Sequence, residues 1–268
     1  MPRMKLSVLV ITYNHEKFIA RALDGIFSQQ VGFDYEVVIG EDCSTDNTRE
    51  ILNEYKEKYP EKIKLHLREK NLGMNRNFIE TFKDCSGEYI ALLEGDDFWV
   101  VSNKLQSQVE FLDQKLDFAM CFHDVVQFNH STGHCSPWAL RSRQSRYLLE
   151  DVLQGNFIPT AAVVFRRRYI DYFPEFSTKL GMLDWLVNIL VSSRGDIGFI
   201  DQIMGVYSLH DGGVWSSKSQ LNILRSSVAA AQEMLVLLQP KHKEILQHTI
   251  NMWGQVIVRM TQGKVTHV

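Results

Sequence analysis

Three carboxylates stand directly behind a short apolar segment, and their spacing could bind a metal ion. Tyr89–Leu93 is apolar and of strand length, and Glu94, Asp96 and Asp97 follow it. A cluster of ionised carboxylates is unfavourable unless a cation or open solvent lies beside it, because like charges repel and burial penalises the charged form. Hard oxygen ligands of this type favour Mg²⁺ or Mn²⁺ over zinc. The segment therefore predicts a divalent-metal site at a strand end, with a solvated turn as the alternative.

Two earlier apolar segments also end in polar residues. Leu6–Ile11 leads into Thr12-Tyr-Asn14, and Tyr35–Ile39 leads into Glu41-Asp-Cys-Ser-Thr-Asp46. Near-continuous apolar strands that alternate with amphipathic helices are typical of a parallel sheet covered on both faces. Ligands bind such sheets beyond the carboxyl ends of the strands. We therefore expect these polar groups to meet the carboxylates behind residue 93 in one crevice.

The rest of the chain continues this alternation and ends in helices. Apolar spacing predicts helices at 19–27, 104–112 and 183–191, and strands at 63–67, 118–128, 161–165, 197–200 and 206–209. The polar stretch 129–146 is typical of a loop, and helical spacing from residue 219 onward is interrupted by Pro240.

Composition and charge exclude several classes of protein. The 268 residues are 45% hydrophobic with a formal charge of −3, a globular profile without general attraction to nucleic acid. The four cysteines form no Cys-x-x-Cys pair, and the start has no signal-peptide pattern, so we expect a reducing cytoplasm. No apolar run approaches the roughly 20 residues of a membrane-spanning helix, which favours a soluble protein, or one peripheral at the inner face of the membrane.

Five motifs in this order resemble the inverting family 2 glycosyltransferases, which have a GT-A fold. They lie within roughly residues 5–215 and read Val8-Leu-Val-Ile-Thr-Tyr-Asn14, Glu41-Asp-Cys-Ser-Thr-Asp46, Asn71-Leu-Gly73 with Asn77, Glu94-Gly-Asp-Asp97 and Leu183-Asp-Trp185. The resemblance implies an α/β fold: a mostly parallel, Rossmann-like sheet flanked by helices, with a helical C-terminal extension. The glycine-rich phosphate loops of other nucleotide folds are missing after the first strand, so phosphates would be held through a metal.

The resemblance also implies where the nucleotide of a sugar donor binds. Thr12 and Tyr13 would border the base, with Asn14 in the same donor-binding turn. Asp42 would accept a hydrogen bond from the imide N–H of uracil or thymine, which points to a UDP-sugar or a dTDP-sugar.

Further donor contacts follow from the later motifs. Asn71 and Arg76 would complete the base and ribose pocket. The family's D-x-D motif has glutamate at its first position here, so Glu94 could reach the ribose while Asp96 or Asp97 holds Mn²⁺ or Mg²⁺. The sequence does not rank those two aspartates.

The catalytic residues are expected in the second half of the chain. The resemblance places Asp184 as the base that takes the proton from an acceptor hydroxyl during a single inverting displacement. Trp185 could stack on a sugar, and His210 would approach the diphosphate or the metal. Stabilisation of a helix N-terminus is the alternative for Asp184, and packing is the alternative for Trp185 and His210.

The motifs together predict a metal-dependent inverting glycosyltransferase of surface polysaccharide or other glycan synthesis. We expect a nucleotide-binding half at 1–100, an acceptor and catalytic half at 101–215, with acceptor recognition in the loop 129–146, and a helical extension at 216–268. The acceptor would be a saccharide or lipid-linked saccharide. The extension would cover the core or form a homodimer, with peripheral membrane contact as the alternative. A sugar nucleotidyltransferase and a noncatalytic nucleotide-sugar or glycan-binding protein are the rival functions.

Overall fold

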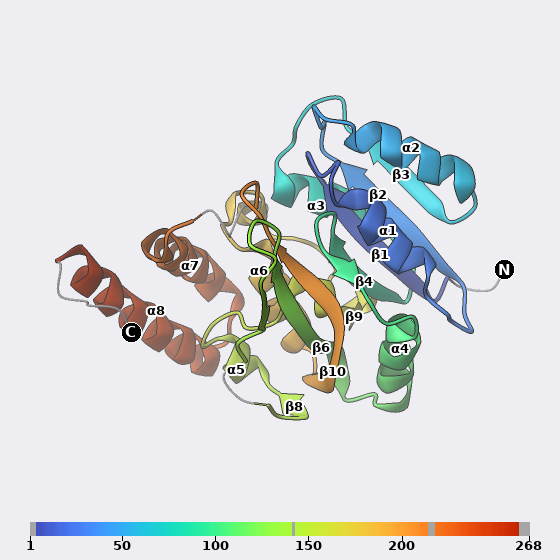
Figure 1. Cartoon of the computed structure of the whole chain (residues 1–268). Helices are drawn as coiled ribbons and strands as arrows, with labels where there is room; N and C mark the ends of the chain where they lie inside the picture. The colour runs from blue at the N-terminus through green and yellow to red at the C-terminus, as the bar shows by residue number, and fades with distance from the viewer. Residues whose placement is uncertain (1–3, 141–142, 214–217, 263–268) are drawn as a thin grey trace.

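The computed structural model describes residues 4–140, 143–213 and 218–262, and its centre is a ten-stranded sheet within these residues (Figure 1). The strands are β1 (Leu6–Thr12), β2 (Tyr35–Glu41), β3 (Ile63–Leu67), β4 (Tyr89–Glu94), β5 (Phe98–Trp99), β6 (Phe118–Asn129), β7 (Cys135–Pro137), β8 (Arg146–Tyr147), β9 (Val164–Arg166) and β10 (Asp196–Leu209). Their order is β3-β2-β1-β4-β9-β6-β10-β5, with β7 on β6 and β8 on β10.

Helices connect the strands and cover both faces of the sheet. They are α1 (Ile19–Phe27), α2 (Thr48–Lys58), α3 (Met74–Lys83), α4 (Lys104–Gln114), α5 (Leu149–Val152), α6 (Leu183–Ser192), α7 (Gln220–Met234) and α8 (Pro240–Thr261). Short 3-10 helices lie at η1 (Thr160–Ala162), η2 (Arg167–Tyr169), η3 (Glu175–Lys179) and η4 (Leu235–Leu237).

The sheet confirms the predicted α/β architecture and adds antiparallel strands to it. β3, β2, β1 and β4 are parallel neighbours, whereas β9 runs antiparallel to both β4 and β6. The strand predicted at 161–165 is shorter and follows the 3-10 turn η1. The two strands predicted at 197–200 and 206–209 are one long strand, β10, whose register with β6 shifts at Ile200 and Ile203. The predicted loop 129–146 contains β7 and the start of β8.

The register of the parallel strands brings the polar strand ends to one edge. Thr12 of β1 lies opposite Glu41 of β2, and Ile11 lies opposite Glu94 of β4. Parallel strands end on the same side of a sheet, so the residues behind these three positions face a common space.

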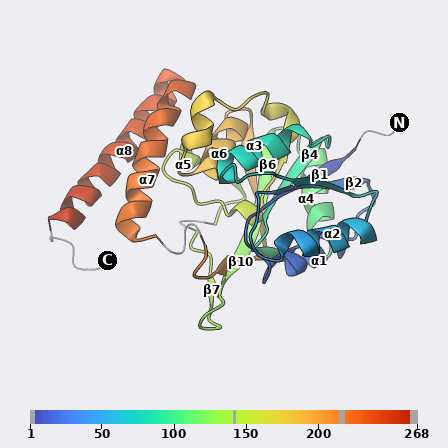
Figure 2. The same cartoon turned by 90° about the horizontal axis from the view of Figure 1, so that it is seen from above.

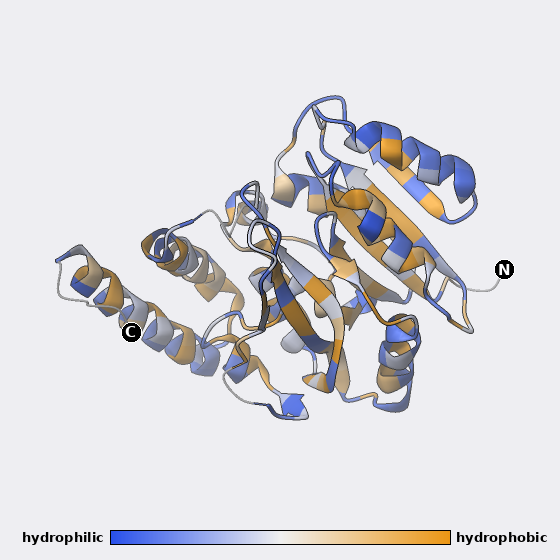
Figure 3. Ribbon diagram, in the orientation of Figure 1, coloured by the Kyte–Doolittle hydropathy of each residue, from blue (hydrophilic) through white to orange (hydrophobic). Residues whose placement is uncertain are grey.

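Alternate residues of the apolar strands build a core on each face. Val8 and Val10 pack with α1 and α4 on one face, and Leu9 packs with α3 and α6 on the other. Figure 2 shows α1 and α2 on one side of the sheet and α3 and α6 on the opposite side. In Figure 3 the β1 ribbon is mostly orange whereas α2 on the surface is mostly blue, as expected for a central strand of a sheet covered on both faces.

The C-terminal helices α7 and α8 lie side by side at the end of the molecule opposite α2 (Figures 1 and 2). Ala231 of α7 and Leu246 of α8 are buried in the same core as α6. The predicted interruption at Pro240 is confirmed: α7 ends at Met234, and Pro240 is the first residue of α8. The ring fits there because the missing N–H has no partner in a helix's first turn. The predicted boundary at 215–216 lies outside the described residues. No helix in the described ranges combines the length and apolarity needed to cross a bilayer.

Candidate active site

A cavity of about 280 Å³, here called the polar cavity, opens at the carboxyl ends of β1, β2 and β4. The described residues that line it are Ile11, Thr12, Tyr13, His15, Asp42, Asn71, Gly73, Met74, Asn77, Glu94, Asp96, Tyr207, Ser208, Gly212 and Gly213. Six residues predicted to bind the donor are therefore brought together: Thr12, Tyr13, Asp42, Asn71, Glu94 and Asp96.

Asp42 is held in the polar cavity by the backbone of the segment before α3. Its carboxylate oxygens accept hydrogen bonds from the backbone N–H groups of Leu72 (2.7 Å) and Gly73 (2.9 Å). Gly73 has a φ of +83°, a conformation that favours glycine. Burial raises the pKa of Asp42, and the two N–H groups oppose that shift. Each carboxylate oxygen has a second lone pair, so Asp42 can accept a further hydrogen bond from a ligand.

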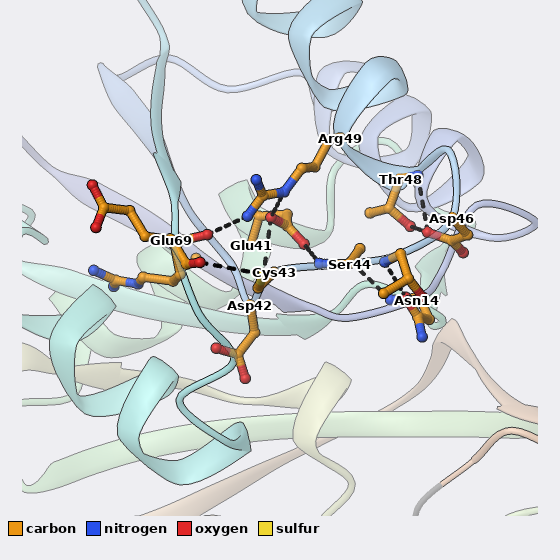
Figure 4. Close-up of polar contacts among 12 residues, drawn as sticks. Asn14, Glu41, Asp42, Cys43, Ser44, Asp46, Thr48, Arg49 and Glu69 are labelled. Atoms are coloured by element: carbon orange, nitrogen blue, oxygen red, sulfur yellow. Dashed lines mark hydrogen bonds and ion pairs between the residues drawn. The ribbon is translucent and has the colours of Figure 1, made fainter.

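Glu41, the neighbour of Asp42, anchors the following loop from the other side of β2. In Figure 4 its carboxylate turns toward Arg49, whereas that of Asp42 points away from it. Glu41 accepts hydrogen bonds from Arg49 Nε and from the backbone N–H of Ser44, each 2.5 Å long. Cys43, which stands between Asp42 and Ser44 in the chain, has a φ of +65°. This anchoring fixes the strained turn that presents Asp42 to the cavity.

Asp96 and His210 meet at the edge of the polar cavity. His210 Nε2 lies 3.0 Å from Asp96 Oδ2, and His15 Nε2 lies 3.7 Å from the same oxygen. His15 is oriented by Thr12, whose Oγ1 lies 3.2 Å from His15 Nδ1. The other oxygen, Asp96 Oδ1, is buried and has no hydrogen-bond partner among the described residues. A buried carboxylate oxygen in this state calls for a ligand.

Asp97 is turned away from the cavity, against the prediction that it is a metal ligand. It is buried, and its Oδ1 accepts a hydrogen bond from the backbone N–H of Ser208 at 2.8 Å. Burial raises the pKa of Asp97 well above its usual value, and the charges of Asp96 and Glu94 raise it further. Asp97 Oδ2, like Asp96 Oδ1, is buried without a hydrogen-bond partner among the described residues. Of the two aspartates only Asp96 lines the polar cavity, and this position favours Asp96 as the ligand.

Asp96 fits a Mg²⁺ or Mn²⁺ ion that is shared with a ligand. Ions of this kind often keep several waters and take one or two carboxylates together with substrate phosphates. Within residues 4–140, 143–213 and 218–262, no three His, Cys, Asp or Glu side chains form a complete metal site. The protein's share of such a site would be Asp96 with His210 beside it.

A second cavity of about 270 Å³, here called the apolar cavity, adjoins the polar one. Its described lining residues are Leu9, Ile11, Met74, Phe78, Leu92, Leu93, Glu94, Trp138, Asn156, Ile158, Pro159, Thr160, Met182, Leu183, Asp184, Tyr207 and Ile223. The two cavities share Ile11, Met74, Glu94 and Tyr207.

Asp184 lies in the first turn of α6 and faces the apolar cavity. Its Oδ2 accepts a hydrogen bond of 2.5 Å from Asn156 Nδ2, and Asn156 Oδ1 accepts one of 3.0 Å from Asn188. Burial raises the pKa of Asp184, while the backbone N–H of Trp185 and the Asn156 amide oppose the shift. A carboxylate with a raised pKa and a fixed orientation can act as a general base.

Glu94 and Tyr207 stand at the junction of the two cavities. Burial raises the pKa of Glu94 to about 8, and the charges of Asp96 and Asp184 add to this shift. Burial also raises the pKa of Tyr207, with contributions from Glu94 and the neighbouring carboxylates. The Tyr207 phenol therefore stays a neutral hydrogen-bond donor between the acidic groups.

Three predicted donor contacts lie away from both cavities. Asn14 Oδ1 accepts a hydrogen bond from the backbone N–H of Thr45 at 2.8 Å and so ties two loops together. Arg76 is on the exposed side of α3. Trp185 is completely buried, and its Nε1 donates to the carbonyl of Val152 at 2.8 Å. The predicted stacking of Trp185 on a sugar is therefore wrong, because the ring is part of the core.

Sequence reasoning missed four side chains of the site: His15, Trp138, Asn156 and Tyr207. His15 follows Thr12 by three residues, and Tyr207 precedes His210 by three, so their proximity to predicted residues was a usable signal. Trp138 and Asn156 come from loops far from any motif, and only the tertiary fold brings them to Asp184.

The family model for glycosyl transferase family 2 matches residues 7–173, and the chain belongs to this family. The match covers every strand that contributes to the polar cavity except β10, and it ends before Asp184.

Relatives and solved structures agree with this assignment. The chain is 34% identical to an uncharacterized protein of Mycobacterium tuberculosis and 30% identical to an uncharacterized glycosyltransferase of Nostoc sp., over 79% and 77% of this chain. It spans only 61% and 65% of their lengths. A crystal structure of Staphylococcus aureus TarS in complex with UDP-GlcNAc superposes with a TM-score of 0.69 and 25% identity, covering 92% of this chain and 72% of that one.

A mannosyltransferase of Pyrobaculum calidifontis, solved in complex with GDP-Man and Mn²⁺, shares the fold at a TM-score of 0.65. Its identity to this chain is 14%, over 99% of this chain and 77% of that one. The predicted GT-A fold and family are confirmed by these findings together.

The buried position of Trp185 predicts a structural role. Its ring packs 5.6 Å from that of Trp253, so we expect Trp185→Ala to lower the free energy of unfolding by about 3–5 kcal/mol through the cavity it leaves. Urea unfolding monitored by circular dichroism measures this. Tyr172→Ala, at a 70% exposed side chain, should change it by less than about 0.5 kcal/mol. Equal effects of the two changes would contradict the packing of Trp185.

Proposed function

We propose that the chain is a metal-dependent inverting glycosyltransferase that moves a sugar from a UDP-sugar or dTDP-sugar to a saccharide hydroxyl. One observation carries the proposal: a polar cavity with Asp42 and Asp96 adjoins a second cavity with Asp184, and Glu94 belongs to both. The donor nucleotide would occupy the first cavity and the acceptor the second. The sugar to be transferred would lie at their junction.

The polar cavity has the groups that a uracil nucleotide needs. Asp42 keeps lone pairs for the imide N–H of the base, and Tyr13, with 42% of its surface exposed, can cover the ring. TarS, which was solved with UDP and with UDP-GlcNAc, shares the fold. TarS and the putative teichuronic acid glycosyltransferase TuaG of Bacillus subtilis are each 34% identical to this chain over 41% of its length. Both names concern cell-wall polymers, which supports a role in surface polysaccharide synthesis.

The transfer is a single displacement at the anomeric carbon. The acceptor oxygen forms the new bond to that carbon while its proton passes to the Asp184 carboxylate, and the carbon–oxygen bond to the diphosphate breaks with its electron pair leaving on the nucleoside diphosphate. Asn156 fixes the direction of the Asp184 carboxylate. A bound Mg²⁺ or Mn²⁺ would neutralise charge on the departing diphosphate. Asp96 and His210 would hold that ion.

The rival functions differ from this one in what is released. A sugar nucleotidyltransferase would consume a nucleoside triphosphate, and a binding protein would release nothing. Incubation with a panel of nucleotide sugars, Mn²⁺ and candidate acceptors, followed by measurement of released nucleoside diphosphate, separates the three.

Removal of the proposed base should stop transfer and spare donor binding. We expect Asp184→Asn to lower kcat at least about 100-fold, because general-base catalysis contributes roughly that much or more, with UDP affinity within about twofold. The measurements are initial rates of UDP release and calorimetric titration with UDP. Asp171→Asn, at an exposed site, is the control. Near-normal transfer by the Asp184 variant would refute its role as base.

The two neighbouring aspartates should differ in their effect on metal-dependent binding. Asp96→Ala should weaken the Mn²⁺-dependent part of UDP binding about tenfold or more, since of the two carboxylates it removes the one that lines the polar cavity. Asp97→Asn should leave the Mn²⁺ dependence unchanged, because Asp97 faces Ser208. Calorimetry of UDP binding with and without Mn²⁺ measures both. If Asp97→Asn weakens Mn²⁺-dependent UDP binding and Asp96→Ala does not, Asp97 is the metal ligand.

The hydrogen bond from Asn156 should set the pH dependence of the reaction. Asp184 acts as a base only when ionised, so the rate falls as the pH drops below its pKa. Asn156→Leu removes a donor that stabilises the carboxylate, so the pKa rises and the acidic limb of kcat/KM should move up by about one unit. Rates from pH 5 to 9 test this, with Asn251→Leu on the exposed side of α8 as the control. If the acidic limb of the kcat/KM profile does not move in Asn156→Leu, Asp184 does not set the pH dependence of the reaction.

A further inference from the structure

The charges around the apolar cavity restrict what can enter it. Among its described lining residues, Glu94 and Asp184 are acidic and none is Lys, Arg or His. Arg143, five residues after Trp138 in the chain, is already paired with Asp124 and Asp201, each at 2.5 Å. A phosphate in this space would meet the Asp184 carboxylate in a poorly hydrated environment, without a counter-charge from the described lining residues, which is unfavourable.

The walls of the apolar cavity offer an aromatic surface on one side. The rings of Trp138 and Tyr207 cross at 62° with centroids 5.3 Å apart. Trp138 is only half-buried, and its Nε1 donates to the carbonyl of Phe157 at 2.8 Å, so the ring is fixed while one side stays accessible. Such rings pack well against the apolar C–H face of a pyranose, whose hydroxyl groups then point to polar partners at the edge.

The position of Asp184 indicates which substrate this surface contacts. If Asp184 takes the proton of the acceptor hydroxyl, that hydroxyl must lie within hydrogen-bond distance of the carboxylate. Asp184 lines the apolar cavity only, whereas Glu94 and Tyr207 also line the polar one. The acceptor ring therefore lies in the apolar cavity, beside Trp138.

We propose that the acceptor is an uncharged saccharide whose ring packs on Trp138 and Tyr207, and that phosphate-bearing acceptors are excluded by Asp184 in a cavity whose described lining holds no cationic side chain. This inference rests on the proposed function. It separates this chain from TarS, whose name describes transfer to poly(ribitol-phosphate) and which is 34% identical over 41% of this chain. The nucleotide side of the site can be shared while the acceptor side differs.

The test is a matched pair of acceptors on the unmodified protein. With one accepted donor and Mn²⁺, kcat/KM is measured for neutral alkyl glycosides, for the same glycosides carrying one phosphate, and for ribitol phosphate oligomers. We expect transfer to a neutral glycoside and at least a 100-fold lower kcat/KM for its phosphorylated form and for the oligomers. Comparable or better transfer to either phosphate-bearing acceptor overturns the inference.

Variants then locate the acceptor ring. Trp138→Ala should raise the acceptor KM at least tenfold with the donor KM within twofold, and Trp138→Phe should recover most of the loss. Tyr13→Ala, in the polar cavity, should raise the donor KM and leave the acceptor KM within twofold. An unchanged acceptor KM in a folded Trp138→Ala protein contradicts the proposed packing.

A binding measurement separates failure of this inference from failure of the proposed function. Absence of nucleoside diphosphate release from every donor would refute the function. Saturation-transfer NMR on the UDP-loaded protein still decides the acceptor class in that case. Contact with neutral glycosides that is lost in Trp138→Ala and retained in Trp138→Phe supports the inference, whereas contact with phosphorylated glycosides alone, or with neither class, overturns it.

Discussion

Repulsion among carboxylates at the ends of parallel strands is the constraint on which the site depends. Each acidic group needs a partner from another part of the fold: Asp96 has His210 after β10, and Asp184 has Asn156 from the loop before η1. Glu94 lies between them, and its pKa is raised by burial and by both neighbouring charges. Glu94 is therefore the carboxyl group whose charge depends most on a proton or on a bound substrate, at the junction where the sugar would lie.

The strands of the parallel part of the sheet were predicted from their apolar runs. β1, β2 and β4 are nearly continuous apolar runs, and their common edge followed from the rule for parallel sheets. The helix α3 was not predicted, and its buried face is partly polar. Asn75 donates to the carbonyls of Ser177 and Leu180, and Asn77 donates to that of Gly40. The partners of these buried amides come from distant parts of the chain, and only the folded structure supplies them.

The candidate site was predictable where residues follow strand ends, and less so on helices and long loops. Asp184 and Trp185 are neighbours on α6, and successive helical residues point about 100° apart, so they cannot both face one cavity. The direction of Asp184 into the cavity turns Trp185 into the core. The aromatic surface predicted at Trp185 is supplied by Trp138, which follows β7, and its position depends on the pairing of β7 with β6.

Both cavities of the site take residues from beyond the segment that the family model matches. Beyond residue 173 lie Ser208, Gly212 and Gly213 of the polar cavity, Asp184 and Ile223 of the apolar cavity, and Tyr207, which lines both. Ile223 belongs to α7, and Ser227 one turn further on donates to the sulfur of Met182 at 3.2 Å, which joins α7 to the segment before Asp184. The C-terminal helices thus form part of the wall around the proposed base. If the acceptor occupies the apolar cavity as proposed, substitutions at Ile223 of α7 would alter the acceptor side without changing any residue that lines the polar cavity.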